Sequence, residues 1–113
     1  MGKASRTKGK NYELEIRKAL WPFWTDVRRN LKQYQETDGR DFDNTEPLCI
    51  QAKRRKRVTM GVVEQALVEA DVACDDTYRY PVVVFRSDNG RSKVLMELEH
   101  FVEWLCLMED GQL

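Results

Sequence analysis

Histidine and cysteine are scarce in this sequence, which narrows the chemistry it can support. His100 is the only histidine among 113 residues. The three cysteines, Cys49, Cys74 and Cys106, are far apart, and no two of them have the spacing of metal ligands. These features argue against a classical zinc site and against a mechanism that needs a histidine base. We interpret the cysteines as small buried apolar residues of a protein in a reducing compartment.

Long apolar segments are also missing. The first ten residues, MGKASRTKGK, contain no apolar stretch that would serve as a signal peptide, and no later run approaches the length that crosses a membrane. The sequence therefore predicts a soluble intracellular protein that is not secreted and has no membrane partner.

Net charge is absent too, because 19 Lys and Arg residues balance 19 Asp and Glu residues. The two halves of the chain nevertheless differ in sign. Residues 1–57 hold 15 basic and 8 acidic residues, whereas residues 58–113 hold 4 basic and 11 acidic residues. One interpretation is a basic surface, drawn from the first half, that faces a polyanion. The other is two solvated faces of opposite sign.

The first half of the sequence is predicted to contain a basic arm, a helix and a short strand. Residues 1–10 are rich in Lys, Arg and Gly and are expected to form a flexible arm, which leaves residues 11–113 as a single domain. From Asn11 the pattern is that of a helix with one buried face, limited by Pro22. Residues 25–31 favour a short strand, and residues 35–47 are polar and rich in turn formers. The apolar positions of the helical pattern are Tyr12, Ile16, Ala19, Leu20 and Phe23.

The middle of the sequence predicts a strand followed by a helix. Leu48–Ala52 is a short apolar strand that runs into the basic block Lys53–Arg57. Thr59 is the expected N-cap of a second helix. The positions expected on the inner face of that helix are Val63, Ala66, Leu67 and Ala70.

The last third predicts a hairpin and a final helix. Val82–Phe85 is a continuous apolar run, typical of a strand buried on both faces. Asn89-Gly90 favours a two-residue hairpin turn, with Lys93–Leu98 as the returning strand. The last helix carries an apolar stripe formed by Leu98, Phe101, Val102 and Leu105. The predicted fold class is therefore α/β, with one central mixed β-sheet flanked by helices.

Two short segments carry residue types suited to phosphodiester hydrolysis. Asp41-Phe42-Asp43 lies in the turn-rich region, and Ile50-Gln51-Ala52-Lys53 covers the end of the apolar strand. Such hydrolysis needs a divalent cation and a positive group close to the charge that develops. Mg²⁺ prefers oxygen ligands and takes only one or two carboxylates from a protein. Because alternate strand residues share a face, Gln51 and Lys53 point the same way, and the Ala52 carbonyl is left to face the metal.

In these motifs the chain resembles the PD-(D/E)xK nuclease superfamily, and most closely the small endonucleases of the archaeal Holliday-junction-resolvase type and their phage-encoded relatives. Gly9-Lys10-Asn11-Tyr12-Glu13 matches the Gly-x-x-x-Glu pattern of the first helix, and Asp41-Phe42 matches an Asp followed by a hydrophobic residue. Ile50–Lys53 matches the (D/E)xK strand, with Gln51 in place of the acidic residue. The resemblance covers roughly residues 8–105 and implies a restriction-endonuclease-like core.

The resemblance also implies a role for each matched residue. Asp41 would be the central metal ligand, and Glu13 would bind the metal or a water attached to it. Lys53 would orient the attacking water and stabilise the transition state. Gln51 would ligate through its amide oxygen but brings no charge, so we expect weaker metal affinity than with Glu. The cofactor implied is Mg²⁺, for which Mn²⁺ would substitute.

The activity implied is that of an endodeoxyribonuclease acting on branched DNA in recombination, as a homodimer, in the cytoplasm of a prokaryotic cell or a phage-infected host. A two-fold dimer would present two active sites to a symmetric junction. Its interface is expected at Val82–Phe85, at the hairpin, or at the last helix with Trp104, Leu107 and Met108. The residues expected to contact DNA phosphates are Lys3, Arg6, Lys8, Lys10, Arg28, Arg29, Arg54, Arg55, Lys56 and Arg57.

Alternatives remain open for single residues. Asp43 competes with Asp41 as the metal ligand, although the spacing to Lys53 favours Asp41. Glu13 would also favour a helix N-terminus without any role in catalysis, and Lys53 would fit an ordinary solvated charge run. Gln65 on the second helix is a further candidate for the metal site. Trp21, Trp24 and Tyr34 are candidates for stacking on unpaired bases, or for simple packing.

Alternatives also remain for the function. Because Gln51 is not acidic, the chain would also fit a non-catalytic, structure-specific DNA-binding module on a degenerate nuclease scaffold. A nicking or linear-duplex endonuclease, or an RNA-directed nuclease, would have the same sequence pattern.

Overall fold

The computed structural model describes residues 2–31 and 40–111, with side chains from Thr7 onward in the first of these stretches. The elements in chain order are α1 (Gly2–Leu20), β1 (Arg28–Arg29), β2 (Phe42–Asp43), β3 (Leu48–Arg55), α2 (Met60–Val72), β4 (Tyr80–Ser87), β5 (Lys93–Leu95) and α3 (Leu98–Glu109).

The described strands form two sheets. In the larger sheet, of order β3-β4-β5, β3 and β4 run parallel and β5 is antiparallel to β4. The parallel pair is connected through α2, as parallel neighbours require a crossover. In the smaller sheet, β1 and β2 are antiparallel. The predicted α/β class with a mixed sheet and flanking helices is confirmed, but the prediction of one single sheet is wrong.

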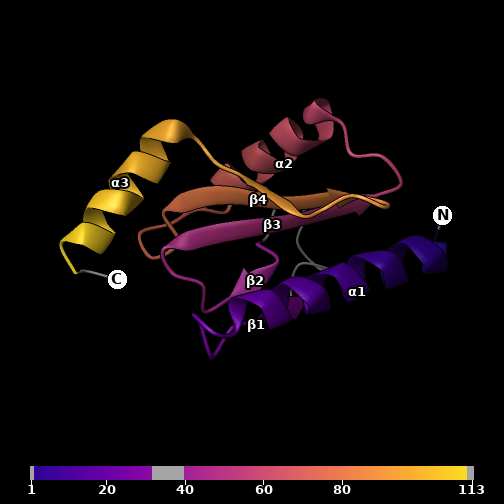
Figure 1. Cartoon of the computed structure of the whole chain (residues 1–113), viewed down its shortest axis with the longest axis horizontal. Coiled ribbons are helices and arrows are strands. Elements are labelled where there is room, and N and C mark those ends of the chain that lie inside the picture. Colours follow the sequence, from indigo (N-terminus) through magenta and orange to yellow (C-terminus); the bar gives the residue numbers. More distant parts are fainter. Residues whose placement is uncertain (1, 32–39, 112–113) are drawn as a thin grey trace.

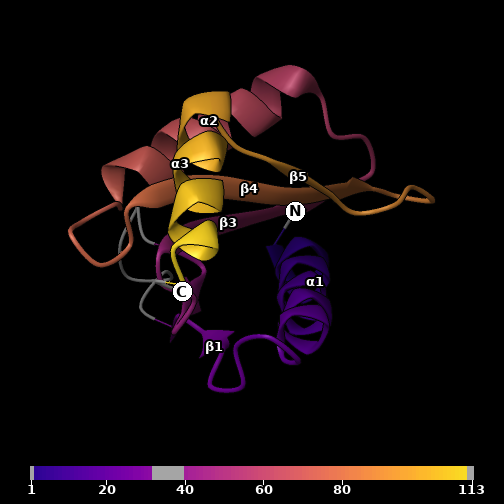
Figure 2. The same ribbon diagram turned by 60° about the vertical axis from the view of Figure 1, so that its left-hand side comes forward.

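The helices cover both faces of the β3–β4 pair (Figure 1). Helix α1 lies on one face and α2 on the other, whereas α3 stands at one end of the sheet, as the turned view also shows (Figure 2). No helix among the described residues is long and apolar enough to span a membrane.

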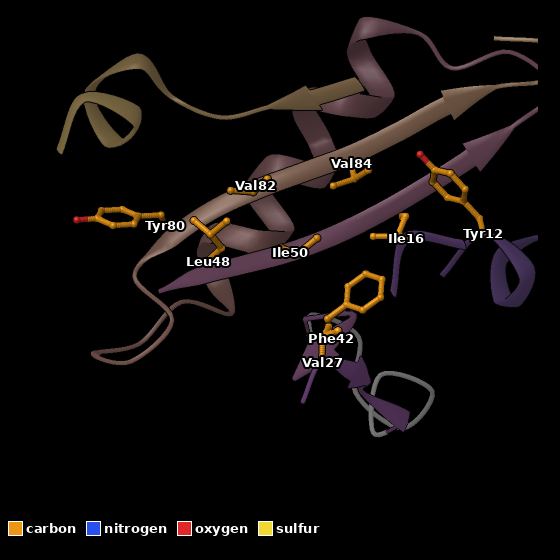
Figure 3. Packing of buried hydrophobic residues seen from close by; sticks show 9 residues of the cluster. All are labelled: Tyr12, Ile16, Val27, Phe42, Leu48, Ile50, Tyr80, Val82 and Val84. Atoms are coloured by element: carbon orange, nitrogen blue, oxygen red, sulfur yellow. The ribbon is translucent and has the colours of Figure 1, made fainter. Parts of the chain in front are cut away.

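The main core lies between α1 and the larger sheet (Figure 3). Tyr12 and Ile16 of α1 pack against Ile50 of β3 and against Val82 and Val84 of β4. On the opposite face, Val83 packs against α2 in a second cluster. Because successive strand residues point to opposite faces, a strand covered on both sides needs a continuous apolar run. The prediction that Val82–Phe85 is such a strand is confirmed for its three valines.

Helix α1 is longer than predicted. Residues 2–10 belong to it, so the helix begins well before Asn11, where the sequence pattern placed its start. The helix ends at Leu20, before Pro22, as expected from the missing N–H and the ring of proline. Its buried face is shorter than predicted: Ala19 is exposed, and Phe23 beyond the helix is 60% exposed.

Other local predictions hold in part. Thr59 caps α2, where its Oγ1 accepts a hydrogen bond from the Val62 N–H at 3.3 Å. A turn is present at Asn89-Gly90, where the Gly90 N–H donates to the Ser87 carbonyl at 3.0 Å. The two-residue hairpin predicted there is wrong, because β4 ends at Ser87, β5 begins at Lys93, and Phe85 pairs with Lys93. The expected strand over residues 25–31 is reduced to β1, and the returning strand Lys93–Leu98 is reduced to β5.

The prediction that the cysteines are buried holds only in part. Cys49 is buried and Cys74 is half-buried, but Cys106 is exposed. The apolar stripe of α3 points to solvent, because the helix contacts the domain through its other side, with Trp104 and Leu107.

Candidate active site

Asp41 directly precedes β2 and is bonded to β3 through both its main chain and its side chain. Its N–H donates to the Ile50 carbonyl at 2.9 Å, and its Oδ2 accepts from the Ala52 N–H at 2.6 Å. The residue is buried, with 7% of its surface exposed. The carboxylate is therefore fixed against the middle of β3.

The residues of β3 that follow face two directions. Cys49 donates to the Ala70 carbonyl of α2, and the Lys53 ammonium also reaches α2, so Gln51 between them faces α2 as well. Gln51 is buried. The N–H of Ala52 points toward Asp41, and since the N–H and C=O of a strand residue point to the same side, its carbonyl does too. The strand thus directs the Ala52 carbonyl toward the Asp41 carboxylate.

Burial raises the pKa of Asp41 to about 7. The Ala52 N–H and the Lys53 ammonium oppose this rise, whereas the negative charges of Glu13 and Glu69 add to it. The net result is a carboxyl group that gives up its proton near neutral pH. A cation at this position would favour the ionised form.

Glu13 is held in α1 opposite β1. The Arg29 Nε donates to Glu13 Oε1 at 2.8 Å, and both side chains are nearly buried. Arg29 was predicted to contact DNA phosphates; its guanidinium instead lies against Glu13. The pair joins the helix to β1 and fixes the Glu13 carboxylate close enough for its charge to act on Asp41.

The structure distinguishes Asp41 from its competitor Asp43. The Asp43 carboxylate is half-buried and lies 3.1 Å from the Arg40 guanidinium, with which it forms an i, i+3 ion pair. Asp41 alone of the two is bonded to the strand that carries Gln51 and Lys53. The geometry therefore favours Asp41 as the metal ligand.

Glu69 is a site residue that the sequence patterns missed. Its Oε2 lies 3.6 Å from the Lys53 Nζ, so it holds the candidate catalytic lysine from α2. The only available signal was its position one turn after Gln65, which places both on one face of the helix. A cavity of about 350 Å³ lies between the end of β3 and α2, and its lining includes Lys53, Arg55, Gln65 and Glu69.

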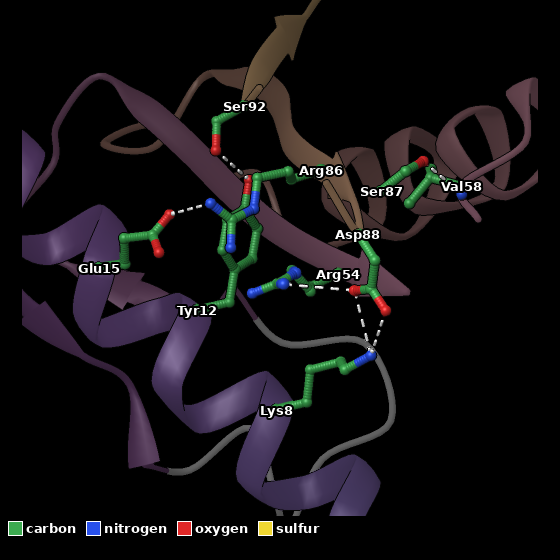
Figure 4. Close-up of polar contacts among 9 residues, drawn as sticks. All are labelled: Lys8, Tyr12, Glu15, Arg54, Val58, Arg86, Ser87, Asp88 and Ser92. Atoms are coloured by element: carbon green, nitrogen blue, oxygen red, sulfur yellow. Dashed lines mark hydrogen bonds and ion pairs between the residues drawn. The ribbon is translucent and has the colours of Figure 1, made fainter. Parts of the chain in front are cut away.

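Apart from Arg29, the predicted phosphate-binding residues with described side chains fall into two groups. Lys8 and Arg54 are both engaged with Asp88, at 3.1 Å and 3.3 Å (Figure 4). Both ion pairs lower the pKa of Asp88, with the Lys8 hydrogen bond as the largest cause. The second group is exposed and consists of Lys10, Arg28, Arg55, Lys56 and Arg57.

The remaining residues that were predicted to contact nucleic acid are Lys3, Arg6, Tyr34, Trp21 and Trp24. The side chains of Lys3 and Arg6, and the whole of Tyr34, lie outside the described residues. Trp21 is 56% exposed, whereas Trp24 packs partly against the main core.

The oxygen atoms around Asp41 suit a hard cation such as Mg²⁺. Among the residues with described side chains, no three or more His, Cys, Asp or Glu groups are arranged to hold a metal ion. Mg²⁺ needs fewer, because it takes one or two carboxylates and keeps several waters. Asp41, the Ala52 carbonyl and the Gln51 amide would hold it, with Glu13 nearby, and the buried charge of Asp41 would then be compensated.

In comparisons with known proteins, no family model, no curated protein and no solved structure matches this chain.

Proposed function

We propose that this protein is a Mg²⁺-dependent endonuclease that hydrolyses phosphodiester bonds in DNA. The observation that carries the proposal is Asp41, a buried carboxylate with a pKa of about 7, bonded to the strand segment that bears Gln51 and Lys53. Such a group destabilises the fold when ionised, and strongly perturbed acids of this kind cluster at functional sites. The parallel β3–β4 pair with α1 and α2 on opposite faces supports a restriction-endonuclease-like core.

The chain supplies positioning and charge. A bound Mg²⁺ would polarise the phosphate and lower the pKa of the attacking water. Lys53, held by Glu69 at the wall of the cavity, orients that water and stabilises the negative charge that develops on the phosphate. Mn²⁺ would substitute, since it accepts the same oxygen ligands.

Exposed basic side chains beyond β3 would hold the DNA. Arg55, Lys56 and Arg57 continue from the strand that carries Lys53, and Lys10 is exposed on α1. Such contacts neutralise phosphates and fix the register without reading sequence. We propose branched DNA as the preferred substrate and recombination in the cytoplasm of a prokaryotic cell or a phage-infected host as the setting.

A second candidate function is DNA binding without cleavage. It is favoured by Gln51, which brings no charge. It is also favoured because no three or more His, Cys, Asp or Glu side chains among the described residues are arranged to hold a metal ion. In this case Asp41 and Lys53 would serve binding and folding alone.

A cleavage assay separates the two functions. Four-way junction, flap, nicked and linear duplexes are incubated with the protein in Mg²⁺, Mn²⁺ or EDTA. We expect metal-dependent cutting with the junction preferred, and a loss of at least about 100-fold in Asp41→Asn and Lys53→Ala. Asp43→Asn, which loses only the pair with Arg40, is the matched control and should cut normally.

The alternatives give different results. Binding without any cutting by the wild-type protein would overturn the nuclease and favour the second function. Preferred cutting of linear duplex would identify a linear-duplex endonuclease, single-strand cuts a nicking enzyme, and preferred cutting of RNA an RNA-directed nuclease.

A further inference from the structure

Helix α3 turns an apolar face to solvent. No residue of the helix is buried. The exposed apolar side chains, at 40% to 74% of their surface, are Leu98, Phe101, Val102, Leu105 and Met108. A contiguous apolar face of this kind is uncommon on a monomer and marks an interaction surface.

An apolar cavity lies where this face meets the edge of the larger sheet. Its volume is about 420 Å³, and it is lined by Val94, Leu95, Met96, Leu98, Phe101 and Trp104. The lining side chains are aliphatic or aromatic, with the thioether of Met96 and the indole of Trp104 as the groups that contain a heteroatom. The cavity therefore suits an apolar or aromatic side chain.

Within the segment that forms α3 the charge has one sign, although the exposed Arg79 lies nearby, over the Tyr80 ring that contacts His100 of the helix. The sequence contains no Lys or Arg from residue 94 to the end. The exposed acidic residues on and next to α3 are Glu97, Glu99, Glu103, Glu109 and Asp110. A partner for this face must therefore be apolar at its centre and basic at its rim.

The chain itself has a surface of that description, at the end of α1. Trp21 is 56% and Phe23 is 60% exposed. Arg17 and Lys18, the basic residues of the last helical turn, are exposed close by in the chain, and so is Arg28, with the exposed Asp26 as the acidic residue of this segment. We call the two aromatic and three basic residues the basic aromatic corner. The end of α1 and helix α3 lie toward the same end of the molecule in Figure 1.

We propose that two copies of this chain form a two-fold dimer in which the α3 face of each protomer packs on the basic aromatic corner of the other. Trp21 and Phe23 of one protomer then cover the apolar cavity of its partner. A two-fold axis forms both contacts at once, because each chain carries both surfaces. Packing α3 against α3 would instead bring two acidic faces together, which like-charge repulsion opposes. The inference stands apart from the nuclease proposal.

The test is the oligomeric state in EDTA without DNA, measured by sedimentation equilibrium. We expect wild type to have twice the mass of the chain at about 100 μM. Leu98→Glu should be monomeric, and Trp21→Ala should raise the dissociation constant at least about 30-fold. Leu98 is 74% exposed, so its substitution leaves the fold intact, as circular dichroism would verify. Val72→Glu, at an exposed apolar position of α2, is the matched control and should remain dimeric.

A charge exchange tests which surfaces meet. Lys18→Glu and Glu99→Lys should each weaken the dimer about 3- to 10-fold, and the double variant should recover much of the loss. A monomeric wild type, a dimer unaffected by Trp21→Ala, or a double variant no better than the single ones would overturn the proposal. A fast wild-type disulfide between two Cys106 residues would overturn it too, because it requires α3 against α3. None of these results depends on cleavage.

Discussion

At the residue scale, Asp41 should make the metal-free protein less stable as the pH rises. Its pKa is about 7 in the folded chain, against an ordinary value of 3.8. The folded state therefore binds this proton more tightly than the unfolded chain does. The resulting stability is complete below a pH of about 4, declines between about 4 and 7, and is lost above that range.

Replacing Asp41 by Asn should remove this dependence. The amide keeps an oxygen for the Ala52 N–H but does not ionise. We expect Asp41→Asn to be more stable than wild type at about pH 8, by up to about 4 kcal/mol, and close to wild type at about pH 4. Urea unfolding in EDTA across this range measures the difference. Asp43→Asn should follow wild type, and a difference between wild type and Asp41→Asn that is constant with pH would contradict the prediction.

Gln51 should limit the affinity for metal. A Glu at this buried position would add a second charge on the strand that binds Asp41, which favours Mg²⁺ and disfavours the empty site. We expect Gln51→Glu to bind Mg²⁺ about 10-fold more tightly by calorimetry and to unfold more easily in EDTA at alkaline pH. Val72→Glu, which adds the same charge at an exposed position of α2 outside the cavity lining, is the control. Equal Mg²⁺ affinity in wild type and Gln51→Glu would mean that the cation binds elsewhere.

The sequence predicts the side-chain directions of residues that share a local pattern, but it does not predict which residues of other elements they contact. Alternation along the strand predicts that every second side chain shares a face, and Cys49 and Lys53 both reach α2. Nothing in a local pattern says that Lys53 pairs with Glu69, or that Arg29 pairs with Glu13. These contacts join different elements, so they depend on how the elements pack.

At the element scale, Asp88 ties the first half of α1 to the end of the sheet. It follows β4 and pairs with Lys8 of α1 and Arg54 of β3 (Figure 4). The same two cations were predicted to contact DNA phosphates. Asp88 therefore competes with DNA for them, and its removal would release both.

Asp88→Asn should consequently strengthen binding to DNA. We expect affinity to rise several-fold at low salt, with a steeper dependence on salt concentration, because more counterions are released when more phosphates are neutralised. Fluorescence anisotropy with a labelled junction over a salt series measures both quantities. Asp26→Asn removes an equal charge at an exposed position and controls for net charge. An unchanged salt slope would show that Lys8 and Arg54 do not reach the DNA.

The ends of helices could be predicted where a single local sequence pattern determines them. Pro22 limits α1, and Thr59 starts α2, because each effect is local. The apolar spacing on α3 predicts a helix correctly but cannot say what covers it. Its stripe is exposed, and the helix contacts the core through the side with Trp104 and Leu107.

At the scale of the whole molecule, the charge asymmetry of the sequence is partly cancelled by folding. Lys8, Lys53 and Arg54 of the basic half pair with Glu69 and Asp88 of the acidic half. What remains is separated along the molecule: β3 leads toward the exposed basic block at one end, and acidic α3 stands at the other (Figure 1). Apart from Arg28, which belongs to the basic aromatic corner, the residues proposed for phosphate binding and those proposed for protein contact thus lie toward opposite ends.

This separation predicts that a monomeric variant keeps an active site able to cut, but loses the ability to cut both strands in one binding event. A two-fold dimer carries two active sites, so it should cut both strands of a junction within one binding event. The monomeric Leu98→Glu should cut one strand at a time. On a supercoiled plasmid with an extruded cruciform, wild type should give linear product directly, whereas Leu98→Glu should accumulate nicked circles first. Val72→Glu should behave as wild type. Direct linear product from monomeric Leu98→Glu would mean that paired cutting does not need the dimer.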